Sequence, residues 1–301
     1  MKRTLKKLFK NASSLTGILL LLIFIFIAIF APLLTPSYQD YMKHGFMMFP
    51  DDPYQIPLNF NSTPSAPDKF NIMGVTGGGY DIYYGIIWGT RSAFRIGLIV
   101  VGSCAIIGII IGSFSAYFGG WVDEIIMRIT DIFMSFPFLV AAMVMTAILG
   151  KGLNNVMIAL IVFGWMGYAR LIRASVLVAK EDVYVSAARA LGASNFRIVF
   201  RHILPNTIYP SLIQASMDMG SMVITAAALS FLGVGSEPGY ADWGQMISFA
   251  RNWIITPGHG MEYWYTFLYP GLAIVLFSLS WNLVGDALRD ILDPRLRGQL
   301  K

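Results

Sequence analysis

The chain is poor in charged side chains. Asp, Glu, Lys and Arg together make up only 13% of its 301 residues, whereas hydrophobic residues make up 56%. Soluble globular domains carry about 25% charged residues. So small a charged fraction excludes an ordinary soluble domain and indicates a protein that is largely buried in a lipid bilayer.

Cysteine and histidine are also scarce. Cys104 is the only cysteine, so a disulfide within the chain and a cysteine metal cluster are both excluded. The three histidines, His44, His202 and His259, fall in different segments and lack the paired spacing of a metalloenzyme helix. We therefore expect neither a metal nor another cofactor in this chain.

Two motifs that are common in enzymes are missing. The chain has no Gly-x-x-x-x-Gly-Lys-Ser/Thr segment, which excludes ATP hydrolysis by a phosphate-binding loop of its own. The run Gly233-Val234-Gly235-Ser236 lacks the spacing of a Gly-x-Ser-x-Gly nucleophile elbow. We expect a protein that is not itself an enzyme.

Long uncharged runs are abundant, in contrast. A membrane-spanning helix needs about 20 mostly apolar residues. Charged residues are absent from residues 11–39, 96–122, 132–150 and 152–169, and further apolar runs lie near 206–235 and 263–285. We predict an all-α polytopic membrane protein with six transmembrane helices, the third and fourth of which are joined by a short turn near residues 151–155.

Basic residues are distributed unevenly around these runs. Five precede the first run, namely Lys2, Arg3, Lys6, Lys7 and Lys10. Connections rich in Lys and Arg stay on the cytoplasmic side of a membrane, whereas acidic residues have little influence. We therefore expect a cytoplasmic N-terminus and, after six spans, a cytoplasmic C-terminus. The net charge of +5 follows from this topology and requires no nucleic-acid partner.

Arg170 and Arg173 lie at the end of the fourth run. Under the same charge rule they are cytosolic anchors of that helix. A role in an inner gate is the alternative, and the sequence leaves both interpretations open.

The connections on the outer side are long. Residues 35–90 are too many for a simple loop and contain six prolines, so we expect a small packed cap or a contact with a partner. Residues 236–262 contain Tyr240, Trp243 and Trp253, and such rings commonly sit at the membrane interface. The alternative is that part of this segment lines an outer mouth. We divide the chain into residues 1–90, with the first helix and the outer loop, and residues 91–301, a core with five transmembrane helices.

A polar, basic insert, residues 181–206, separates the fourth and fifth runs on the expected cytoplasmic side. The pattern predicts two short helices that meet at Gly192, which suits the left-handed conformation that ends a helix. Ser194 suits the cap of the second helix. One apolar face of that helix is predicted from the spacing of Phe196, Val199, Phe200 and Ile203.

This insert resembles the cytoplasmic EAA loop of ABC importer permeases, and residues 181–206 are hereafter the EAA-like segment. The family pattern has an acidic residue, two alanines, a glycine and a later Leu-Pro pair. The matching residues are Ala187, Ala188, Gly192, Leu204 and Pro205. Ser186 replaces the acidic residue, and His202 replaces an isoleucine. The wider sequence is similar to the C-type permease of the oligopeptide/dipeptide and nickel branch.

The resemblance implies the type I ABC importer permease fold in the plasma (cytoplasmic) membrane of a prokaryote. The chain would form half of the transmembrane pathway for di- or oligopeptides delivered by an extracytoplasmic substrate-binding protein. Its other partners would be a second homologous permease subunit and two cytosolic ABC ATPase subunits, which would hold ATP and Mg²⁺.

Other substrates and another class of transporter stay open. Relatives in this branch also import nickel chelates, glutathione or oligosaccharides, and the residues do not choose among these. A channel or secondary transporter that acts without an ATPase is the alternative from a different functional class.

By the same resemblance, the EAA-like segment docks on the ATPase and couples it to the membrane helices. The residues expected at this contact are Ser186, Ala187, Ala188, Gly192, Ala193, Ser194, Phe196, Phe200, Leu204 and Pro205.

Asp218 is an acidic residue deep within the fifth apolar run. If that helix starts near residue 206, Asp218 lies about 18 Å into the membrane, at 1.5 Å per residue. A carboxylate at this depth usually faces protein or water. Its neighbours Met217 and Met222 are flexible and polarizable. We expect these three residues to line the translocation pathway, with Asp218 near a substrate amine. A structural pair, for example with a partner subunit, is the alternative for Asp218.

Overall fold

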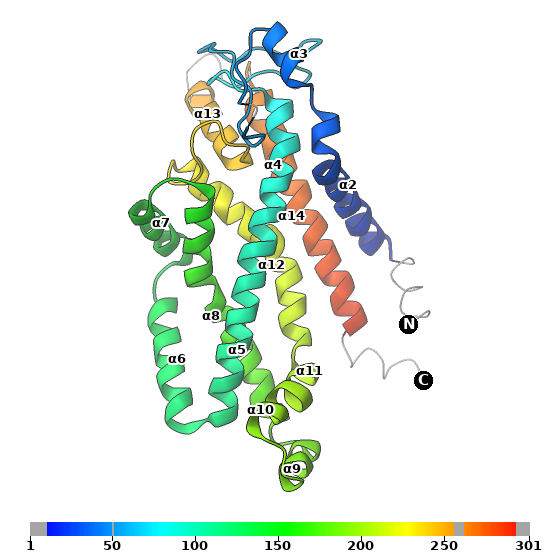
Figure 1. Cartoon of the computed structure of the whole chain (residues 1–301), viewed down its shortest axis with the longest axis vertical. Coiled ribbons are helices and arrows are strands. Elements are labelled where there is room, and N and C mark those ends of the chain that lie inside the picture. Colours follow the sequence, from blue (N-terminus) through cyan, green and yellow to red (C-terminus); the bar gives the residue numbers. More distant parts are fainter. Residues whose placement is uncertain (1–10, 50, 256–261, 293–301) are drawn as a thin grey trace.

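The computed structural model describes residues 11–49, 51–255 and 262–292, which form an elongated bundle of helices (Figure 1). Within these residues, five helical stretches are long and apolar enough to cross a membrane. They are α2 (Ala12–Leu34), the stretch Ile82–Phe118, α8 (Leu153–Ala179), α12 (Tyr209–Phe231) and α14 (Tyr265–Leu292). The predicted all-α polytopic fold is confirmed.

A sixth span results if two bent helices are counted as one. α6 (Gly120–Met134) and α7 (Phe138–Leu149) are bent by 83° relative to each other. Pro137 lies at the break, where it lacks an N–H and disfavours a helical conformation of Phe136. The uncharged run predicted that this span starts at residue 132. The helix already begins at Gly120, because the bundle accommodates the charged side chains of α6.

The second span also begins earlier than its uncharged run. It consists of α4 (Ile82–Ile96), the π-helical turn η1 (Gly97–Val101) and α5 (Gly102–Phe118). The run starts only at residue 96 because two arginines precede it, and both have partners in the bundle. The division between residues 90 and 91 therefore falls inside α4.

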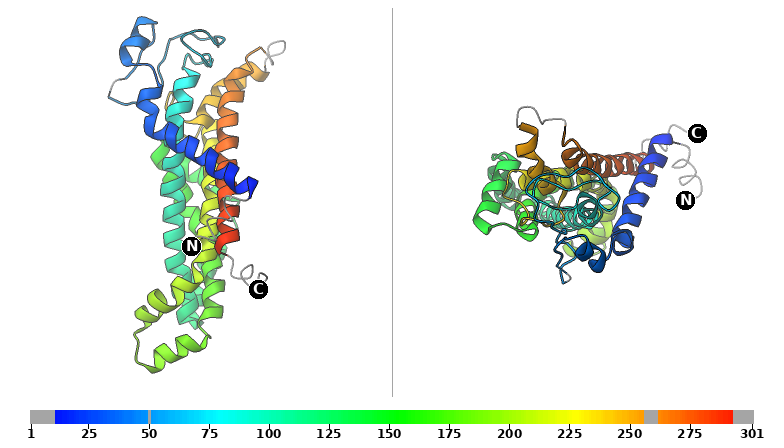
Figure 2. Two further views of the ribbon diagram at one scale, coloured as in Figure 1. Left: turned by 90° about the vertical axis from the view of Figure 1, so that its right-hand side faces the viewer. Right: turned by 90° about the horizontal axis from the view of Figure 1, so that it is seen from above.

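One of these arginines, Arg91, joins α4 to α2 at a proline. Pro32 lies inside α2 and has no N–H to donate to the carbonyl of Ala28, four residues earlier. The Arg91 guanidinium takes this place: Nε donates to the Ala28 oxygen at 2.5 Å, and Nη2 donates to the Ile29 oxygen at 3.1 Å. α2 lies obliquely across one side of the bundle, against α14 and α4 (Figure 2).

α5 and α8 approach each other closely over two glycines. Gly108 and Gly112 lie one helical turn apart on α5 and face the α8 backbone. A Cβ atom at Gly112 would lie 2.2 Å from the carbonyl oxygen of Ala169, so no side chain fits there. Small residues at this spacing are typical of membrane helix pairs. Of the two helices that these glycines bring together, α8 leads directly into the EAA-like segment.

Residues 35–81 form a small packed cap at the end of the bundle opposite the EAA-like segment (Figure 1). Isolated backbone bridges hold it together, such as the antiparallel pairing of Met47 with Leu58. The N–H of Ile56 donates to the carbonyl oxygen of Gly239 at 2.8 Å, which ties the cap to the connection between α12 and α13. The packed cap expected from the length of this connection is confirmed.

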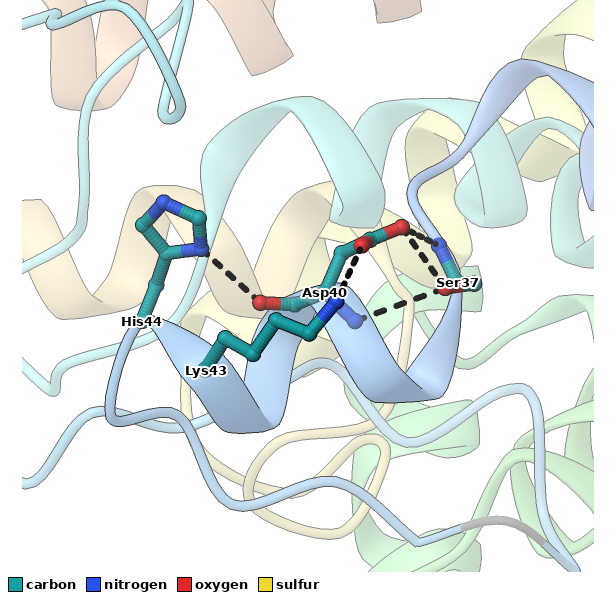
Figure 3. A network of polar contacts seen from close by, with 4 residues as sticks. All are labelled: Ser37, Asp40, Lys43 and His44. Carbon is teal, nitrogen blue, oxygen red and sulfur yellow. Dashed lines mark hydrogen bonds and ion pairs between the residues drawn. The ribbon is translucent and has the colours of Figure 1, made fainter.

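A capping box opens the cap at α3 (Tyr38–Lys43). The Ser37 hydroxyl and the Asp40 carboxylate lie 2.6 Å apart, and each accepts the backbone N–H of the other residue. The hydrogen bond between the Ser37 hydroxyl and the Asp40 carboxylate lowers the pKa of Asp40. The polar contacts around Asp40 are shown in Figure 3 for Ser37, Lys43 and His44.

Asp81 fixes the cap to α4. Its side chain is almost fully buried, and Oδ1 accepts the N–H of Tyr84 at 2.6 Å, which caps the helix. Burial raises the pKa of Asp81 to about 7.

α13 (Trp243–Ile255) returns the outer connection to the bundle. The Trp243 ring is buried, packs against Phe24 and Phe277, and donates from Nε1 to the carbonyl oxygen of Ile86 at 3.2 Å. The Trp243 ring therefore belongs to the core and does not sit at the membrane interface, whereas the expectation that part of this segment lines an outer mouth stays a prediction.

Candidate functional site

The EAA-like segment begins with α9 (Val183–Ala190), which ends in a left-handed turn. Gly192 has φ +78°. Its N–H donates to the carbonyl oxygen of Arg189 at 3.0 Å, and the N–H of Ala193 donates to that of Ala188 at 3.1 Å. These two bonds form a Schellman motif, which confirms the predicted conformation of Gly192.

The second helix of the segment is irregular. Ser194 caps α10 (Asn195–Arg197), as predicted, by accepting the N–H of the last residue of α10 at 3.4 Å. The π-helical turn η2 (Ile198–Ile203) follows, and then α11 (Leu204–Thr207), which carries Pro205 in its first turn. The proline has no N–H with which to continue a regular α-helix, and a π turn brings residues five apart onto one side.

This π turn redistributes the apolar side chains. Ile198 and Ile203, five residues apart, are both fully buried, and Val199 lies beside them. Phe196 and Phe200 were predicted to share that face, but they are 68% and 38% exposed. The predicted single apolar face is wrong: aliphatic side chains pack inward, while the two phenylalanine rings, 4.3 Å apart, form an exposed pair.

The inward face of the segment packs on the ends of α5 and α8. One apolar cluster joins the three parts and contains Ile109, Ala116, Ile172, Val176, Ala179, Val185, Ala188, Ile198, Val199, Ile203 and Leu204. Because protein interiors are close-packed, a displacement of the segment also displaces these helix ends.

The outward face is apolar and exposed. Leu191, at the end of α9, is 88% exposed. The second half of the segment carries a shallow hollow of about 440 Å³, lined by Phe196, Arg197, Phe200, Arg201 and Pro205. Contiguous apolar patches with a polar rim are typical of protein or membrane interaction sites.

The ten predicted contact residues are divided between the two faces. Those that are exposed are Ser186, Ala187, Gly192, Ser194, Phe196, Phe200 and Pro205. Ala193 is half-buried, whereas Ala188 and Leu204 are buried in the inner cluster and hold the segment in shape.

Asp218 lies within α12, and both of its carboxylate oxygens have partners. The Tyr168 hydroxyl of α8 donates to Oδ2 at 2.6 Å, and Gln214 donates from Nε2 to Oδ1 at 2.8 Å. Tyr168 is buried, whereas Asp218 is half-buried. The carboxylate is therefore held in place from α8 and is reachable from one side.

Met217 lies on another side of α12, toward α14, whereas Met222 lies one helical turn from Asp218 and also faces α8. A Cβ atom at Gly285 of α14 would lie 2.7 Å from Cγ of Met217. A Cβ atom at Gly164 of α8 would lie 3.6 Å from Cε of Met222. Both methionines are half-buried, and Met222 shares the side of α12 that faces α8 with Asp218, whereas Met217 does not.

A polar stripe along α12 was not predicted from the sequence. Gln214, Asp218, Ser221 and Thr225 recur at intervals of four, three and four residues, which places them on one side of the helix. Gln214 and Ser221 are exposed, and the other two are half-buried. Because polar groups in a membrane helix rarely face lipid, this side of α12 faces water or another protein. The spacing in the sequence was the signal that could have revealed it.

Comparison with known families identifies this architecture. Residues 108–298 match the family described as binding-protein-dependent transport system inner membrane component. Residues 1–62 match the N-terminal transmembrane domain of oligopeptide transport permease C. The chain belongs to the family of inner membrane components of binding-protein-dependent transport systems. It is thus a multi-pass subunit of a transporter in the plasma membrane and not an enzyme.

Individual relatives agree with this family. The chain is 36% identical over 296 residues to the dipeptide transport system permease protein of Alkalihalophilus pseudofirmus, which covers 98% of this chain and 90% of the relative. It is 38% identical over 240 residues to the glutathione transport system permease protein of Pectobacterium atrosepticum, with 80% and 78% covered. It is 38% identical over 248 residues to the probable D,D-dipeptide transport system permease protein of Escherichia coli K12, with 82% and 80% covered. The resemblance to the oligopeptide/dipeptide branch is confirmed.

Proposed function

We propose that this chain forms half of the transmembrane pathway of an ATP-driven ABC importer of di- or oligopeptides. Membership of the family implies a membrane component that works with a binding protein and an ATPase. Relatives that are named for dipeptides support a peptide substrate. Glutathione, named for other relatives, is itself a tripeptide, so a free amine, a carboxylate and peptide groups are common to these substrates.

The assembly would contain a second homologous permease, two cytosolic ATPases that bind ATP and Mg²⁺, and a substrate-binding protein on the outer side. The EAA-like segment and both termini would then lie in the cytoplasm. In support, the ends of α2 and α14 nearest the termini point toward the same end of the bundle as α9, and the cap lies at the other (Figure 1). The basic residues of the N-terminus favour the same orientation.

The observation that carries the proposal is the two-faced EAA-like segment. Its inner face is buried against α5 and α8, and its outer face exposes Leu191 and the pair of phenylalanine rings. A docked ATPase would cover the outer face. Its closure on ATP would then move the ends of both helices through the inner cluster and switch the pathway between outward- and inward-facing states.

The pathway would run along the polar stripe of α12. Asp218 supports this assignment because it is half-buried, ionisable and held in place by Tyr168. A fixed carboxylate suits the protonated amine of a peptide. Met222 would lie beside Asp218 and Met217 behind the stripe, and both would adapt to different substrates.

The docking role is tested by placing a charge on the outer face. We expect Phe196→Asp to reduce recovery of the ATPase with the purified permease complex by roughly tenfold or more, since exposed aromatic anchors dominate many interfaces. Phe60→Asp is the matched control, because Phe60 is 70% exposed in the outer cap and Phe196 is 68% exposed. Equal ATPase recovery for both variants would contradict the proposed contact.

The substrate is tested with the complete complex reconstituted in liposomes. We expect ATP-dependent uptake of a labelled dipeptide when the binding protein is present on the outside. Unlabelled dipeptides should compete. Uptake of glutathione or of a nickel chelate without peptide uptake would replace the peptide by that substrate, and uptake without an ATPase would contradict the importer.

A further inference from the structure

The last turn of α5 touches the EAA-like segment and the end of α8 at the same level. The Tyr117 hydroxyl donates to Oδ1 of Asn195 in α10 at 2.8 Å. One residue earlier, the carbonyl oxygen of Ala116 accepts a hydrogen bond from Nζ of Lys180 at 3.0 Å. Lys180 is the residue that ends α8. This turn of α5 therefore moves together with the segment and with α8.

The same turn of α5 also reaches α6, through a hydrogen bond to the acidic member of a partly buried ion pair. Ser115 donates a hydrogen bond to Asp123 of α6. Arg173 of α8 holds the same carboxylate with two bonds, from Nε to Oδ1 at 2.7 Å and from Nη2 to Oδ2 at 2.6 Å. The Asp123 side chain is only 16% exposed. Two parallel bonds between a guanidinium and a carboxylate fix the orientation of both helices as well as their distance.

The remainder of α6 is weakly attached. Gly119 and Gly120, with φ +64° and +52°, form the turn that leads into it. Of the residues of α6, all of which the structure describes, Thr130 alone is buried. A second ion pair, between Asp131 and Arg170, supports the helix further along. Charged contacts thus supplement a ring contact with α8, in which the centroids of Phe133 and Phe163 lie 5.9 Å apart.

We propose that Asp123 and Arg173 are positioning residues that lock α6 to α8, so that the bent arm formed by α6 and α7 follows the EAA-like segment when it moves. The proposal rests on the proposed function, because the docked ATPase supplies the movement. The charge rule for membrane topology explains why an arginine lies in the last two turns of α8, but it does not explain a two-bond contact with an acid of another helix.

The test uses the complete complex and compares uptake with ATP consumption. We expect Arg173→Gln and Asp123→Asn to keep the ATPase bound and ATP hydrolysis running. The amount of substrate taken up for each ATP should fall roughly 2- to 30-fold, which is the range for residues that carry coupling between two sites. The exchanged pair, Asp123→Arg with Arg173→Asp, should recover part of the loss.

Arg128→Gln is the matched control. Arg128 lies on the same helix as Asp123, is exposed, and pairs at 3.9 Å with Glu124 of its own helix. Removing this charge leaves the contact between α6 and α8 in place. We therefore expect the ratio of uptake to ATP hydrolysis to stay at the wild-type value.

A second readout follows the arm itself. Spin labels at Ile132→Cys of α6 and Ile158→Cys of α8 report the distance between the helices, and both positions are exposed. The native Cys104 is buried and does not compete for the label. We expect a narrow distance distribution in the wild-type complex and a broadened one in Arg173→Gln, both with and without ATP.

Three outcomes decide the question. An unchanged uptake ratio and an unchanged distance distribution in Arg173→Gln would overturn the proposal. Loss of the assembled complex in both Arg173→Gln and the exchanged pair would also overturn it, since the residues would then serve folding only. A wild-type chain that neither binds an ATPase nor takes up peptide would refute the proposed function before any variant is compared.

Discussion

Three carboxylates on the outer side differ in pKa because their surroundings differ. Asp40 is exposed and accepts hydrogen bonds from Ser37, which lower its pKa. Asp242 accepts hydrogen bonds from two serines, yet its burial raises its pKa. Burial raises the pKa of Asp81 to about 7, so this carboxyl changes charge near neutral pH.

We expect the outer cap to lose stability as the pH rises from about 4 to about 7. The folded pKa of Asp81 lies above its ordinary value of 3.8, so the folded cap retains a proton that the unfolded chain releases. The effect is about 1.4 kcal/mol for each unit of pKa shift. Hydrogen exchange of residues 35–81 at several pH values measures it.

Asp81→Asn should abolish this pH dependence. The N-terminal hydrogen bond of α4 should persist, because the amide oxygen still accepts the N–H of Tyr84. Asp51→Asn, at an exposed position of the same cap, is the control that should leave the dependence unchanged. A wild-type cap with constant protection between pH 4 and 7 would show that Asp81 does not retain the proton.

Asp218 is the residue at which charge and transport are most directly connected. We expect Asp218→Asn to lower uptake of peptides with a free amino terminus roughly tenfold or more, since hydrogen bonds to charged groups contribute about 1.5–3 kcal/mol. Peptides with an acetylated terminus should lose less, and Asp218→Glu should retain part of the activity. Wild-type uptake with unchanged substrate preference in Asp218→Asn would exclude the pathway role and leave the pairing with Tyr168 as its purpose.

At the scale of helices, the shape of the EAA-like segment depends on one left-handed residue. Among the described residues, no heavy atom lies within 4 Å of a Cβ atom placed at Gly192, so substitution there tests backbone conformation rather than packing in this chain. We expect Gly192→Val to weaken ATPase binding roughly 5- to 30-fold, because a left-handed conformation costs most residues about 1–2 kcal/mol.

Gly192→Asn is the matched variant, because asparagine tolerates the left-handed region. It should retain most of the binding, which is measured as ATPase recovered with the purified complex. If asparagine and valine weakened binding equally, the glycine would be required for close contact with the ATPase and not for its conformation.

The chemistry of this segment was only partly predictable. Gly192 and Ser194 were recognised because their roles are local and depend on residue type. The outward position of Phe196 was not, because the spacing rule assumes a regular α-helix and η2 has π-type hydrogen bonds. Ser186, which replaces the acidic residue of the family pattern, is exposed, so its effect on docking depends on the partner.

For the whole molecule, the polar stripe of α12 predicts which surface meets water in the assembled transporter. We expect Ser221→Cys to react with a membrane-impermeant maleimide at least roughly tenfold faster than Ile106→Cys, because the reactive thiolate forms only in contact with water. Ile106 is an exposed apolar residue of α5 and serves as the lipid-facing control. Equal rates in the complete complex would show that the stripe is covered by the second permease.

Uncharged runs predicted the number and order of the spans, but they misplaced two helix starts. α4 begins before the run because its arginines donate hydrogen bonds to acceptors that only the folded bundle provides. α6 begins before its run because Asp123 and Asp131 find arginines on α8. A rule that treats every charge as an interruption cannot anticipate pairing between helices that are distant in sequence.

The contact between Arg91 and the Ala28 carbonyl also bears on how the chain enters the membrane. Inserted singly, α2 would expose a carbonyl that Pro32 leaves without a donor, and α4 would bring an arginine into the hydrocarbon region. When the two helices pack together, Arg91 of α4 donates to the Ala28 carbonyl of α2, so neither group remains without a partner. We therefore expect the first two spans to leave the insertion machinery as a pair rather than one at a time.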